Sequence, residues 1–288
     1  GAGYTAISST QLTIAAGATT ATFNVAVLAD SLDEANETVT LTLSSPSNAT
    51  ISDATGTLTI TDDDATPSLS INDVTDDDED ADNSTFTVTL SSSSSSNVTV
   101  NYATSDGTAT AGADYTAISS TQLTIAAGAT SATFTVAVLA DSLDEANETV
   151  TLTLSSASNA TISDAIGTLT ITDDDATPSV DFNATSSSGS ESVSSKALTV
   201  DLSAAAGRDV TVAYAITGTA TGSGTDFTLA NGTLTITAGA TTGTITIASI
   251  VDDSSTESSE TVVVTLSSPS NASLGDDKVH TYTIIDND

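Results

Sequence analysis

Apolar and polar residues alternate with a period of two along most of this chain. In the segments Phe86-Thr-Val-Thr-Leu90 and Thr149-Val-Thr-Leu-Thr-Leu154 every second side chain is apolar, and threonine fills the positions between them. This alternation is typical of β-strands that bury one face, and β-branched residues suit a pleated sheet. Gly, Asn, Asp and Ser collect between such segments, where turns are expected. The pattern predicts an all-β fold of antiparallel β-sandwiches, with about seven strands in each stretch of roughly 110 residues.

Near-identical segments recur along the sequence. Residues 4–64 match residues 115–175 at all but four positions, and the offset is 115 − 4 = 111 residues. A fixed period of this size indicates a tandem array of domains. We divide the chain into residues 1–64, a partial repeat, residues 65–175, a complete repeat, and residues 176–288, a complete but diverged repeat. The partial repeat lacks about 45 residues that carry the opening strands of the complete one.

Two short linkers, Asp64-Ala-Thr-Pro67 and Asp175-Ala-Thr-Pro178, join the repeats. Proline stiffens each linker and disfavours helix in the residue before it, so we expect a fairly rigid rod rather than flexible tethers. Without its opening strands, the partial repeat would expose an apolar face and an unpaired sheet edge. We expect those strands to come either from upstream sequence of a longer polypeptide or from another subunit by strand donation.

The charge balance is strongly acidic. Asp and Glu number 38 against three basic residues, Lys196, Arg208 and Lys278, which gives a net charge of −35. This charge argues against nucleic-acid partners and against anionic membranes, and it favours divalent cations or a salty exterior. Direct insertion into a membrane is not expected, because no apolar run is long enough to span a bilayer.

The residue types that the sequence lacks indicate where the protein is located and how its domains are stabilised. The sequence has no cysteine, so disulfides and zinc–thiolate sites are excluded. In a secreted domain without disulfides, bound metal ions are expected to stabilise the fold instead. It also lacks methionine and a signal peptide, which indicates a processed chain or an excerpt. We predict an extracellular or cell-surface location.

Acidic residues of the second repeat gather at strand ends. Three carboxylates follow one predicted strand as Asp173-Asp174-Asp175, and further acids lie at the ends of the strands before it. Loops from alternate strands meet at one end of a sandwich, so carboxylates far apart in sequence can converge there. Oxygen ligands without His or Cys favour calcium over transition metals.

Four motifs, taken in order, resemble the Calx-beta domain. They are Asp106-Gly-Thr-Ala-Thr-Ala-Gly-Ala-Asp-Tyr115, Gln122-Leu-Thr-Ile-Ala-Ala-Gly128, Asp141-Ser-Leu-Asp-Glu-Ala-Asn-Glu148 and Ile171-Thr-Asp-Asp-Asp175. That family includes the calcium-binding regulatory domain of sodium/calcium exchangers and tandem repeats of bacterial surface proteins. The resemblance implies an immunoglobulin-like β-sandwich that binds Ca2+.

The resemblance also implies calcium ligands at the positions that match the family's motifs. In the second repeat these are Glu79, Asp114, Asp141, Glu145, Glu148, Asp173, Asp174 and Asp175, with the Leu143 carbonyl as a backbone ligand. In the third repeat they are Glu191, Asp226, Asp252, Asp253, Glu257, Glu260, Asp286, Asn287 and Asp288. In the first repeat Asp30, Glu34, Glu37, Asp62, Asp63 and Asp64 remain, whereas Gly3 replaces the acid that matches Asp114.

Other residues receive structural interpretations. We interpret the acidic loop 76–82 as a solvated turn, apart from Glu79, and His280 as a surface residue of the final strand. The residues expected in the cores are Tyr102, Tyr115, Phe134, Tyr214, Phe227, Ile245 and Ile247. We predict no enzymatic activity, because the chain has no cysteine nucleophile and almost no aromatic or basic residues to bind a sugar or polarise a bond.

The expected function is structural. We expect a calcium-binding segment of an extracellular surface protein, adhesin or fibre, rigidified by Ca2+ at domain ends and junctions. Its expected partners are neighbouring repeats of the same or an identical chain, and no loop identifies a cell-surface or matrix ligand. Two alternatives stay open: a calcium-sensing regulatory module, and a filament subunit completed by strand donation.

Overall fold

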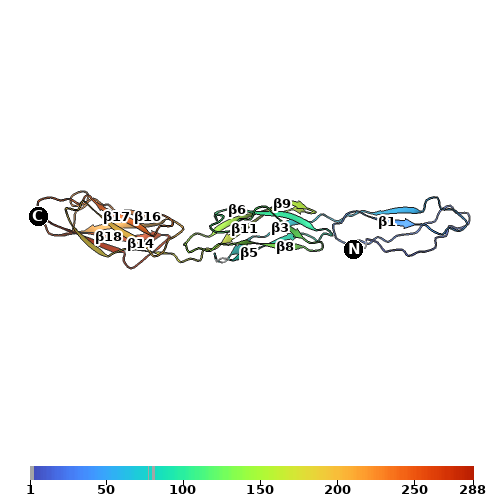
Figure 1. Cartoon of the computed structure of the whole chain (residues 1–288), viewed down its shortest axis with the longest axis horizontal. Coiled ribbons are helices and arrows are strands. Elements are labelled where there is room, and N and C mark those ends of the chain that lie inside the picture. Colours follow the sequence, from blue (N-terminus) through green and yellow to red (C-terminus); the bar gives the residue numbers. More distant parts are fainter. Residues whose placement is uncertain (1–2, 77, 80–81) are drawn as a thin grey trace.

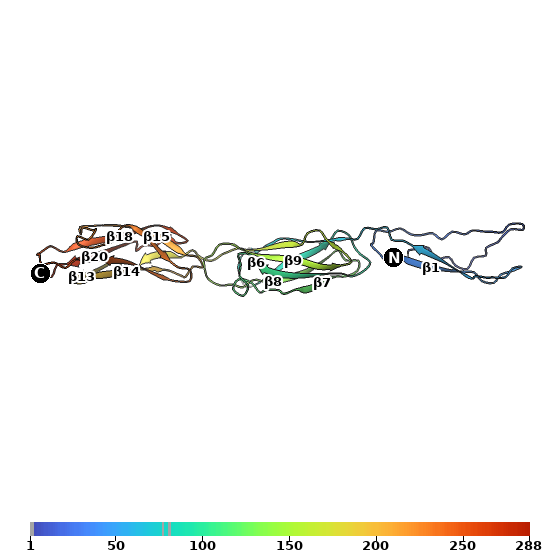
Figure 2. The same ribbon diagram turned by 90° about the horizontal axis from the view of Figure 1, so that it is seen from above.

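The computed structural model describes residues 3–76, 78–79 and 82–288, and the regular elements in these residues are strands. Three units follow one another along one long axis, with the first repeat at one end and the third at the other (Figure 1, Figure 2). The two perpendicular views are both narrow, as expected for repeats joined by short proline-containing linkers. Within the described ranges there is no helix of the length and apolarity needed to cross a membrane.

The second repeat is a sandwich of two sheets, as the alternation predicts. One sheet has the strand order β10-β3-β5-β8 and the other β4-β11-β9-β6-β7. The strands of the first sheet are β3 Ser68–Ile71, β5 Asn83–Leu90, β8 Ser131–Ala137 and β10 Thr161–Ile162. Those of the second are β4 Val74–Asp76, β6 Val98–Asp106, β7 Thr121–Ile125, β9 Glu148–Ser158 and β11 Ile166–Ile171. The long strands pair antiparallel, whereas the short edge strands β10 and β4 run parallel to β3 and β11.

The third repeat has the same architecture. Its sheets have the orders β17-β14-β12-β19 and β13-β20-β18-β15-β16. The strands of the first are β12 Ser179–Phe182, β14 Ser195–Leu202, β17 Thr242–Ala248 and β19 Ser273–Leu274. Those of the second are β13 Ser186–Ser190, β15 Val210–Gly218, β16 Gly232–Ile236, β18 Glu260–Ser270 and β20 Val279–Ile285. Here the serine-rich segment that replaces the acidic loop contributes the edge strand β13, which pairs parallel to β20.

Each complete sandwich buries one hydrophobic core between its sheets. Of the predicted core residues, Tyr115, Phe134, Phe227, Ile245 and Ile247 are buried. Tyr102 and Tyr214 are partly buried and pack against the same cores. In the second repeat the ring of Phe134 stacks on Tyr102, with centroids 3.9 Å apart, and on Phe86 at 5.6 Å. These aromatic side chains therefore pack the hydrophobic cores.

His280 is buried, with 4% of its surface exposed, so its interpretation as a surface residue is wrong. Strand β20 lies between β13 and β18, and its alternate residues His280, Tyr282 and Ile284 point into the sandwich. The imidazole finds polar partners there: Nε2 lies 2.8 Å from Ser187 Oγ, and Nδ1 contacts the carbonyl oxygen of Ala184. The alternation with Tyr282 was the sequence signal for this placement.

The first repeat differs from the others because its described strands form a single pair. These strands, β1 (Glu37–Thr42) and β2 (Thr55–Ile60), are antiparallel. Most of its large apolar side chains are exposed, although several of the matching residues in the second repeat are buried. Phe23 is 49% exposed, for example, whereas Phe134 is 7% exposed. Near-identical sequence thus gives a closed sandwich in one place and an open layer in the other.

Candidate metal centre

Acidic side chains of the second repeat meet at the end of the sandwich that leads into the third repeat. Two groups of three carboxylates form there, and within each group the ligand oxygens lie within 4.8 Å of one another. The groups are Glu79, Asp173 and Asp175, and Asp114, Glu145 and Glu148. Strands β4 and β11 are neighbours in one sheet, and Glu79 follows the first while Asp173 and Asp175 follow the second. The topology thus brings together six of the eight acids singled out in this repeat.

The other two acids, Asp141 and Asp174, belong to neither group. Asp174 is exposed. Asp141 Oδ1 accepts a hydrogen bond of 2.7 Å from the Leu143 amide, which shapes the loop between β8 and β9. The charge of Asp141 still reaches both groups, because it contributes to the raised pKa values of Glu79 and Glu148.

Backbone hydrogen bonds hold the acidic loops against one another. The amide of Glu145 donates to Asp173 Oδ1 at 2.9 Å and so ties the loop after β8 to the segment after β11. The amide of Thr110 donates to Asp114 Oδ2 at 2.6 Å. Tyr115, buried in the core, donates its hydroxyl to Asp106 Oδ1 at 2.7 Å. The carboxylates are therefore positioned by the fold itself.

The grouped carboxylates raise one another's pKa. Burial raises the pKa of Glu79 to about 8, and the adjacent carboxyl of Asp175 and the charges of Asp141 and Asp173 add to the effect. Burial also raises the pKa of Glu148 to about 7, together with the adjacent Asp114. When Glu79 and Asp175 are both ionised, no proton remains to join them, and Glu79 Oε1 and Asp175 Oδ2 are buried with no hydrogen-bond donor among the described residues. Buried charges in this state need a cation.

In chelator, we expect the second repeat to lose stability as the pH rises from about 5 to 8. The pKa values of Glu79 and Glu148, about 8 and about 7, lie above the unfolded value of 4.5. Their contribution to the stability of the folded repeat is therefore fully present below pH 4.5, and it is lost as the pH rises through their pKa values in the folded state. Thermal unfolding in EDTA across this range measures the trend, and the Glu79→Gln, Glu148→Gln double variant should flatten it. A wild-type slope of the opposite sign would contradict the assignment.

Comparison with known protein families accounts for this arrangement. The family model of the Calx-beta domain matches residues 1–64, 52–97, 62–175 and 173–288. The chain belongs to the Calx-beta family. The resemblance seen in the motifs is confirmed, and the chain is a tandem array of Calx-beta domains that carry acidic clusters. Calx-beta domains are usually non-catalytic, and no catalytic family matches the chain.

Solved structures of Calx domains resemble the chain at low sequence identity. CBD12 from CALX1.2 is 21% identical with a TM-score of 0.37, and the match covers 75% of this chain and 99% of that one. The apo form of the Calx CBD1 domain is 24% identical with a TM-score of 0.36, over 38% of this chain and 100% of that one. No curated protein has significant similarity to the sequence.

The third Calx-beta repeat builds its acidic group around a buried glutamate. Ligand oxygens of Glu191, Asp286 and Asp288 lie within 4.8 Å of one another. Glu191 is 6% exposed, and its Oε1 has no hydrogen-bond partner in the part of the chain that the structure describes. Burial and the charge of Asp286 raise the pKa of Glu191. A cavity of about 20 Å³ beside it is lined by further acids, namely Asp226, Asp253, Glu257 and Glu260.

Asn287 and Asp252 form a separate contact in the third repeat. Asn287 Oδ1 accepts hydrogen bonds from the hydroxyl of Ser190 and, at 3.3 Å, from the amide of Ser192. Its Nδ2 donates to Asp252 Oδ1 at 3.4 Å. The amide thus joins the end of β13 to the loop after β17, and its oxygen faces serine donors rather than the acidic group.

The acids of the first Calx-beta repeat do not form a group of three among the described residues. Gly3 stands where the second repeat has Asp114, and a Cβ added to Gly3 would lie 2.6 Å from Glu37 Oε2. Glu37 therefore keeps the place of Glu148 but lacks its acidic neighbour. Burial, followed by the charges of Asp62 and Asp63, raises the pKa of Asp64. The remaining two acids singled out in this repeat are Asp30, whose Oδ1 accepts from the Leu32 amide at 2.9 Å, and Glu34.

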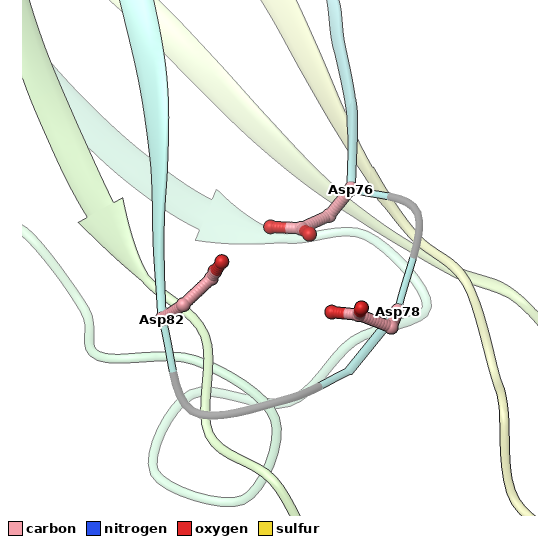
Figure 3. A group of neighbouring side chains, drawn as sticks. All are labelled: Asp76, Asp78 and Asp82. Atoms are coloured by element: carbon pink, nitrogen blue, oxygen red, sulfur yellow. The ribbon is translucent and has the colours of Figure 1, made fainter.

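A further acidic group lies in the loop between β4 and β5. Asp76, Asp78 and Asp82 point toward one another across the loop, with ligand oxygens within 4.8 Å (Figure 3). Asp76 also accepts a hydrogen bond from the Ser84 hydroxyl. The interpretation of this loop as a solvated turn therefore needs correction at Asp76 and Asp78, which are half-buried. The spacing of acids on either side of a turn was the available signal; residues 77, 80 and 81 lie outside the described residues.

The acidic end of the second repeat is also its junction with the third. Asp144 is 3% exposed, and its Oδ2 accepts a hydrogen bond of 2.8 Å from Arg208 Nη2. Its Oδ1 accepts from the linker residue Thr177 at 2.9 Å, and its carbonyl accepts from the Gly207 amide at 3.2 Å. Next to it, Glu145 of the acidic group packs on Gly207, because a Cβ there would lie 1.8 Å from Glu145 Oε1. One loop thus serves both the acidic group and the junction.

At the junction between the first two repeats, Asp33 makes the contacts that Asp144 makes at the second junction, but no arginine takes part. Asp33 Oδ1 accepts from Thr66 at 3.2 Å, and the Asp33 carbonyl accepts from the Ser95 amide at 3.3 Å. A backbone β-bridge joins Asp33 to Ser94 at the first junction, and the matching bridge joins Asp144 to Ala206 at the second. Ser96 and Arg208 each lie two residues after the bridged residue, so Ser96 takes the position of Arg208. Only hydrogen bonds to neutral donors are described at the first junction.

Proposed function

We propose that this chain is a calcium-binding structural segment of an extracellular or cell-surface protein, in which ions at the ends of the sandwiches stiffen both the domains and their junctions. The observation that carries the proposal is the set of buried carboxylate oxygens without donors, on Glu79, Asp175 and Glu191, inside acidic groups. The location of Glu79 and Asp175 at the end of the second repeat that joins the third supports a stiffening role. An adhesin or fibre is the class of parent protein that such a rod suits.

The donor set suits calcium. Every grouped ligand is a carboxylate oxygen, the groups contain neither His nor Cys, and they come from several loops. Calcium accepts six to eight oxygen ligands in flexible geometry, whereas magnesium demands a near-ideal octahedron. In the second repeat Glu79, Asp173 and Asp175 would hold one ion and Asp114, Glu145 and Glu148 another; in the third, Glu191, Asp286 and Asp288 would do so. A bound cation would supply the positive charge that neutralises these clustered carboxylates, most of which are half-buried.

Isothermal titration calorimetry of the full chain tests the calcium proposal. Calcium should give saturable heat, and magnesium at the same concentration should give much less. The variant Glu191→Gln should remove sites of the third repeat, whereas Asp276→Asn, a charge-matched change at an exposed acid in no acidic group, should leave all sites intact. Absence of calcium heat at millimolar concentration would refute the proposal.

A calcium-sensing module is the alternative function, and the contact of Glu145 with Gly207 favours it. In this version an ion that moves Glu145 changes the angle between repeats, and a partner domain detects the change. Site occupancy separates the two functions. Structural sites should remain filled over the whole range of extracellular calcium, whereas sensor sites should fill and empty within the partner's working range.

We expect Arg208→Gln to loosen the junction between the second and third repeats. The change leaves the buried Asp144 without its cationic partner. Because the Arg208 side chain is 36% exposed, the cost should lie below the about 3–5 kcal/mol that loss of one member of a fully buried ion pair has in other proteins. The chain has no cysteine, so two introduced cysteines can carry spin labels, one in each repeat. The distance distribution should broaden in Arg208→Gln and remain narrow in Lys278→Gln, an exposed charge-matched control. Equal distributions would show that the ion pair does not hold the junction.

A further inference from the structure

A polar cavity of about 120 Å³ lies in the third repeat, apart from the acidic group. Its walls are formed by Asn183, Ala184, Ser187, Lys196, Ala197, Leu198, Thr199 and His280. Two of these side chains can carry a positive charge, although the whole sequence has only three Lys and Arg residues and one His. Since one water occupies about 30 Å³ of liquid, the cavity has room for a small chemical group.

His280 takes a position at which the second repeat has a glycine. His280 and Gly167 each lie six residues before the acidic triplet that ends their repeat. A side chain would not fit at Gly167, because an added Cβ would lie 2.8 Å from the carbonyl oxygen of Asn72. The third repeat makes room with a longer crossover between its sheets: four residues separate β12 from Ser187, whereas two separate β3 from the matching Val74. The cavity lies between this crossover and β14.

Beside the cavity, one edge of β14 has no neighbouring strand. β12 pairs with residues 200–202 of β14 and then crosses to the other sheet, whereas residues 195–199 pair only with β17. Backbone groups of successive residues in an antiparallel strand point to opposite edges, and the amide of Leu202 donates toward β17. The backbone groups of Ala197 and Thr199 therefore point to the free edge.

This free edge presents two amides and a carbonyl that have no described partner. The Thr199 carbonyl accepts from the Asn183 amide at 3.0 Å, but no described residue bonds the Thr199 amide, or either backbone group of Ala197, on this side. In the second repeat Asn72 Oδ1 accepts from the matching Thr87 amide at 2.7 Å. The side chain of Asn183 instead donates to a carboxylate on the outer face of β14. The edge is thus left open to an extended peptide.

Lys196 brings a positive charge to the cavity without a matching acid. Its side chain is half-buried, and it has no ion pair among the described residues. The second repeat has Ser84 in this position, and the Ser84 hydroxyl donates to Asp76. In the third repeat Gly189 takes the position of Asp76 in the strand register, so the acid is missing. A half-buried, unpaired lysine in a chain with 38 acidic residues indicates a site for an anion from another molecule.

The free edge is closed at one end by β12. A peptide that pairs along residues 195–199 cannot continue past Asn183, because β12 occupies the edge from there. The peptide must therefore end in the cavity, with either its amino or its carboxyl terminus. The charge of Lys196 repels an ammonium group and attracts a carboxylate, so it selects the carboxyl terminus. A peptide that ends in this way runs parallel to β14.

We propose that this cavity binds the C-terminal carboxylate of an extended peptide from another protein molecule. In a parallel pair the last peptide residue lies opposite Leu198, where its amide donates to the Ala197 carbonyl and its carboxylate accepts from the Thr199 amide. The ammonium of Lys196 neutralises the carboxylate, and the cavity volume favours a small final residue. The site shares no residue with the acidic groups, so it stands apart from the proposed calcium binding.

The probe that tests this is the tripeptide acetyl-Val-Thr-Ala with a free C-terminal carboxylate, titrated onto the full chain in EDTA. EDTA excludes binding of the carboxylate through a cation held by the acidic groups. The amide signals of Ala197 and Thr199 should shift saturably in nitrogen–proton NMR spectra. The same peptide with a C-terminal carboxamide should bind at least about tenfold more weakly, because it loses the charge-assisted bond to Lys196. No saturable shift with the acid, or equal affinities of acid and carboxamide, would overturn the proposal.

Two variants and a smaller ligand test the roles of the named groups. Lys196→Gln should remove the preference for the acid over the carboxamide, whereas Lys278→Gln, the same change at an exposed lysine, should keep it. Thr199→Pro should weaken binding of the acid at least about tenfold and retain the pairing with β17, because the lost amide faces the free edge. Unchanged binding in Lys196→Gln or in Thr199→Pro would overturn the proposal. Acetate cannot donate to the Ala197 carbonyl; acetate that binds as tightly as the tripeptide acid would show a simple anion site and equally overturn it.

Discussion

Millimolar calcium is expected to raise the melting temperature of the chain by about 10 °C or more relative to EDTA. The acidic groups exist only in the folded repeats, so calcium binds the native state and not the unfolded chain. At a hundred times its dissociation constant, one ion adds about 2.7 kcal/mol. In a domain of roughly 100 residues each kcal/mol shifts the melting temperature by about 4–8 °C. Differential scanning calorimetry with and without calcium measures the shift.

The comparison must concern the calcium-induced shift and not the melting temperature alone. Neutralising a grouped acid also relieves repulsion, so Glu79→Gln, Asp175→Asn should melt higher than wild type in EDTA while it gains less from calcium. The single variant Asp276→Asn, at an exposed acid that belongs to no acidic group, should keep the full shift. Equal shifts in both variants would mean that calcium stabilises the chain somewhere other than at these carboxylates.

Much of the fold followed from local pattern. Segments such as residues 86–90 and 149–154 alternate so regularly that only a strand buries their apolar side chains, and the structure places them in β5 and β9. The acidic triplet directly after a strand also located one end of the sandwich correctly. These features could be predicted because each depends on residues close together in sequence.

The features that escaped prediction depend on partners far away in the chain. His280 is expected on the surface from its place in the final strand, but β20 lies between β13 and β18, and its side chain is buried between the sheets. The pair of Asp144 with Arg208 joins residues 64 positions apart in different repeats. Local charge patterns carry no information on such contacts. Likewise, which acids of a loop converge is set by loop geometry, as the group of Asp76, Asp78 and Asp82 shows.

The first two repeats show how strongly the burial of a residue depends on distant parts of the chain, and this dependence can be measured. Phe134 and Phe23 occupy matching positions in near-identical segments, yet one is 7% and the other 49% exposed. Phe134 also stacks on Phe86 and Tyr102, which lie in β5 and β6 of the second repeat and have no counterpart in residues 3–64. The same substitution should therefore have different consequences at the two positions.

Phe134→Ala is expected to lower the free energy of unfolding of the second repeat by about 3–5 kcal/mol, the range found for loss of a buried aromatic side chain. Phe23→Ala should cost less than about 1 kcal/mol, because 49% of the Phe23 surface is already exposed to solvent and little packing is lost. Calorimetry of both variants measures the difference, with Thr135→Ala on the outer face of β8 as the control for a change on the same strand. Similar losses at Phe23 and Phe134 would mean that the first repeat is closed in solution by contacts between chains. When residues 65–111 are fused before Gly1, Phe23→Ala should become as costly as Phe134→Ala, because burial by the added residues, and not the local sequence, determines how much this phenylalanine stabilises the repeat.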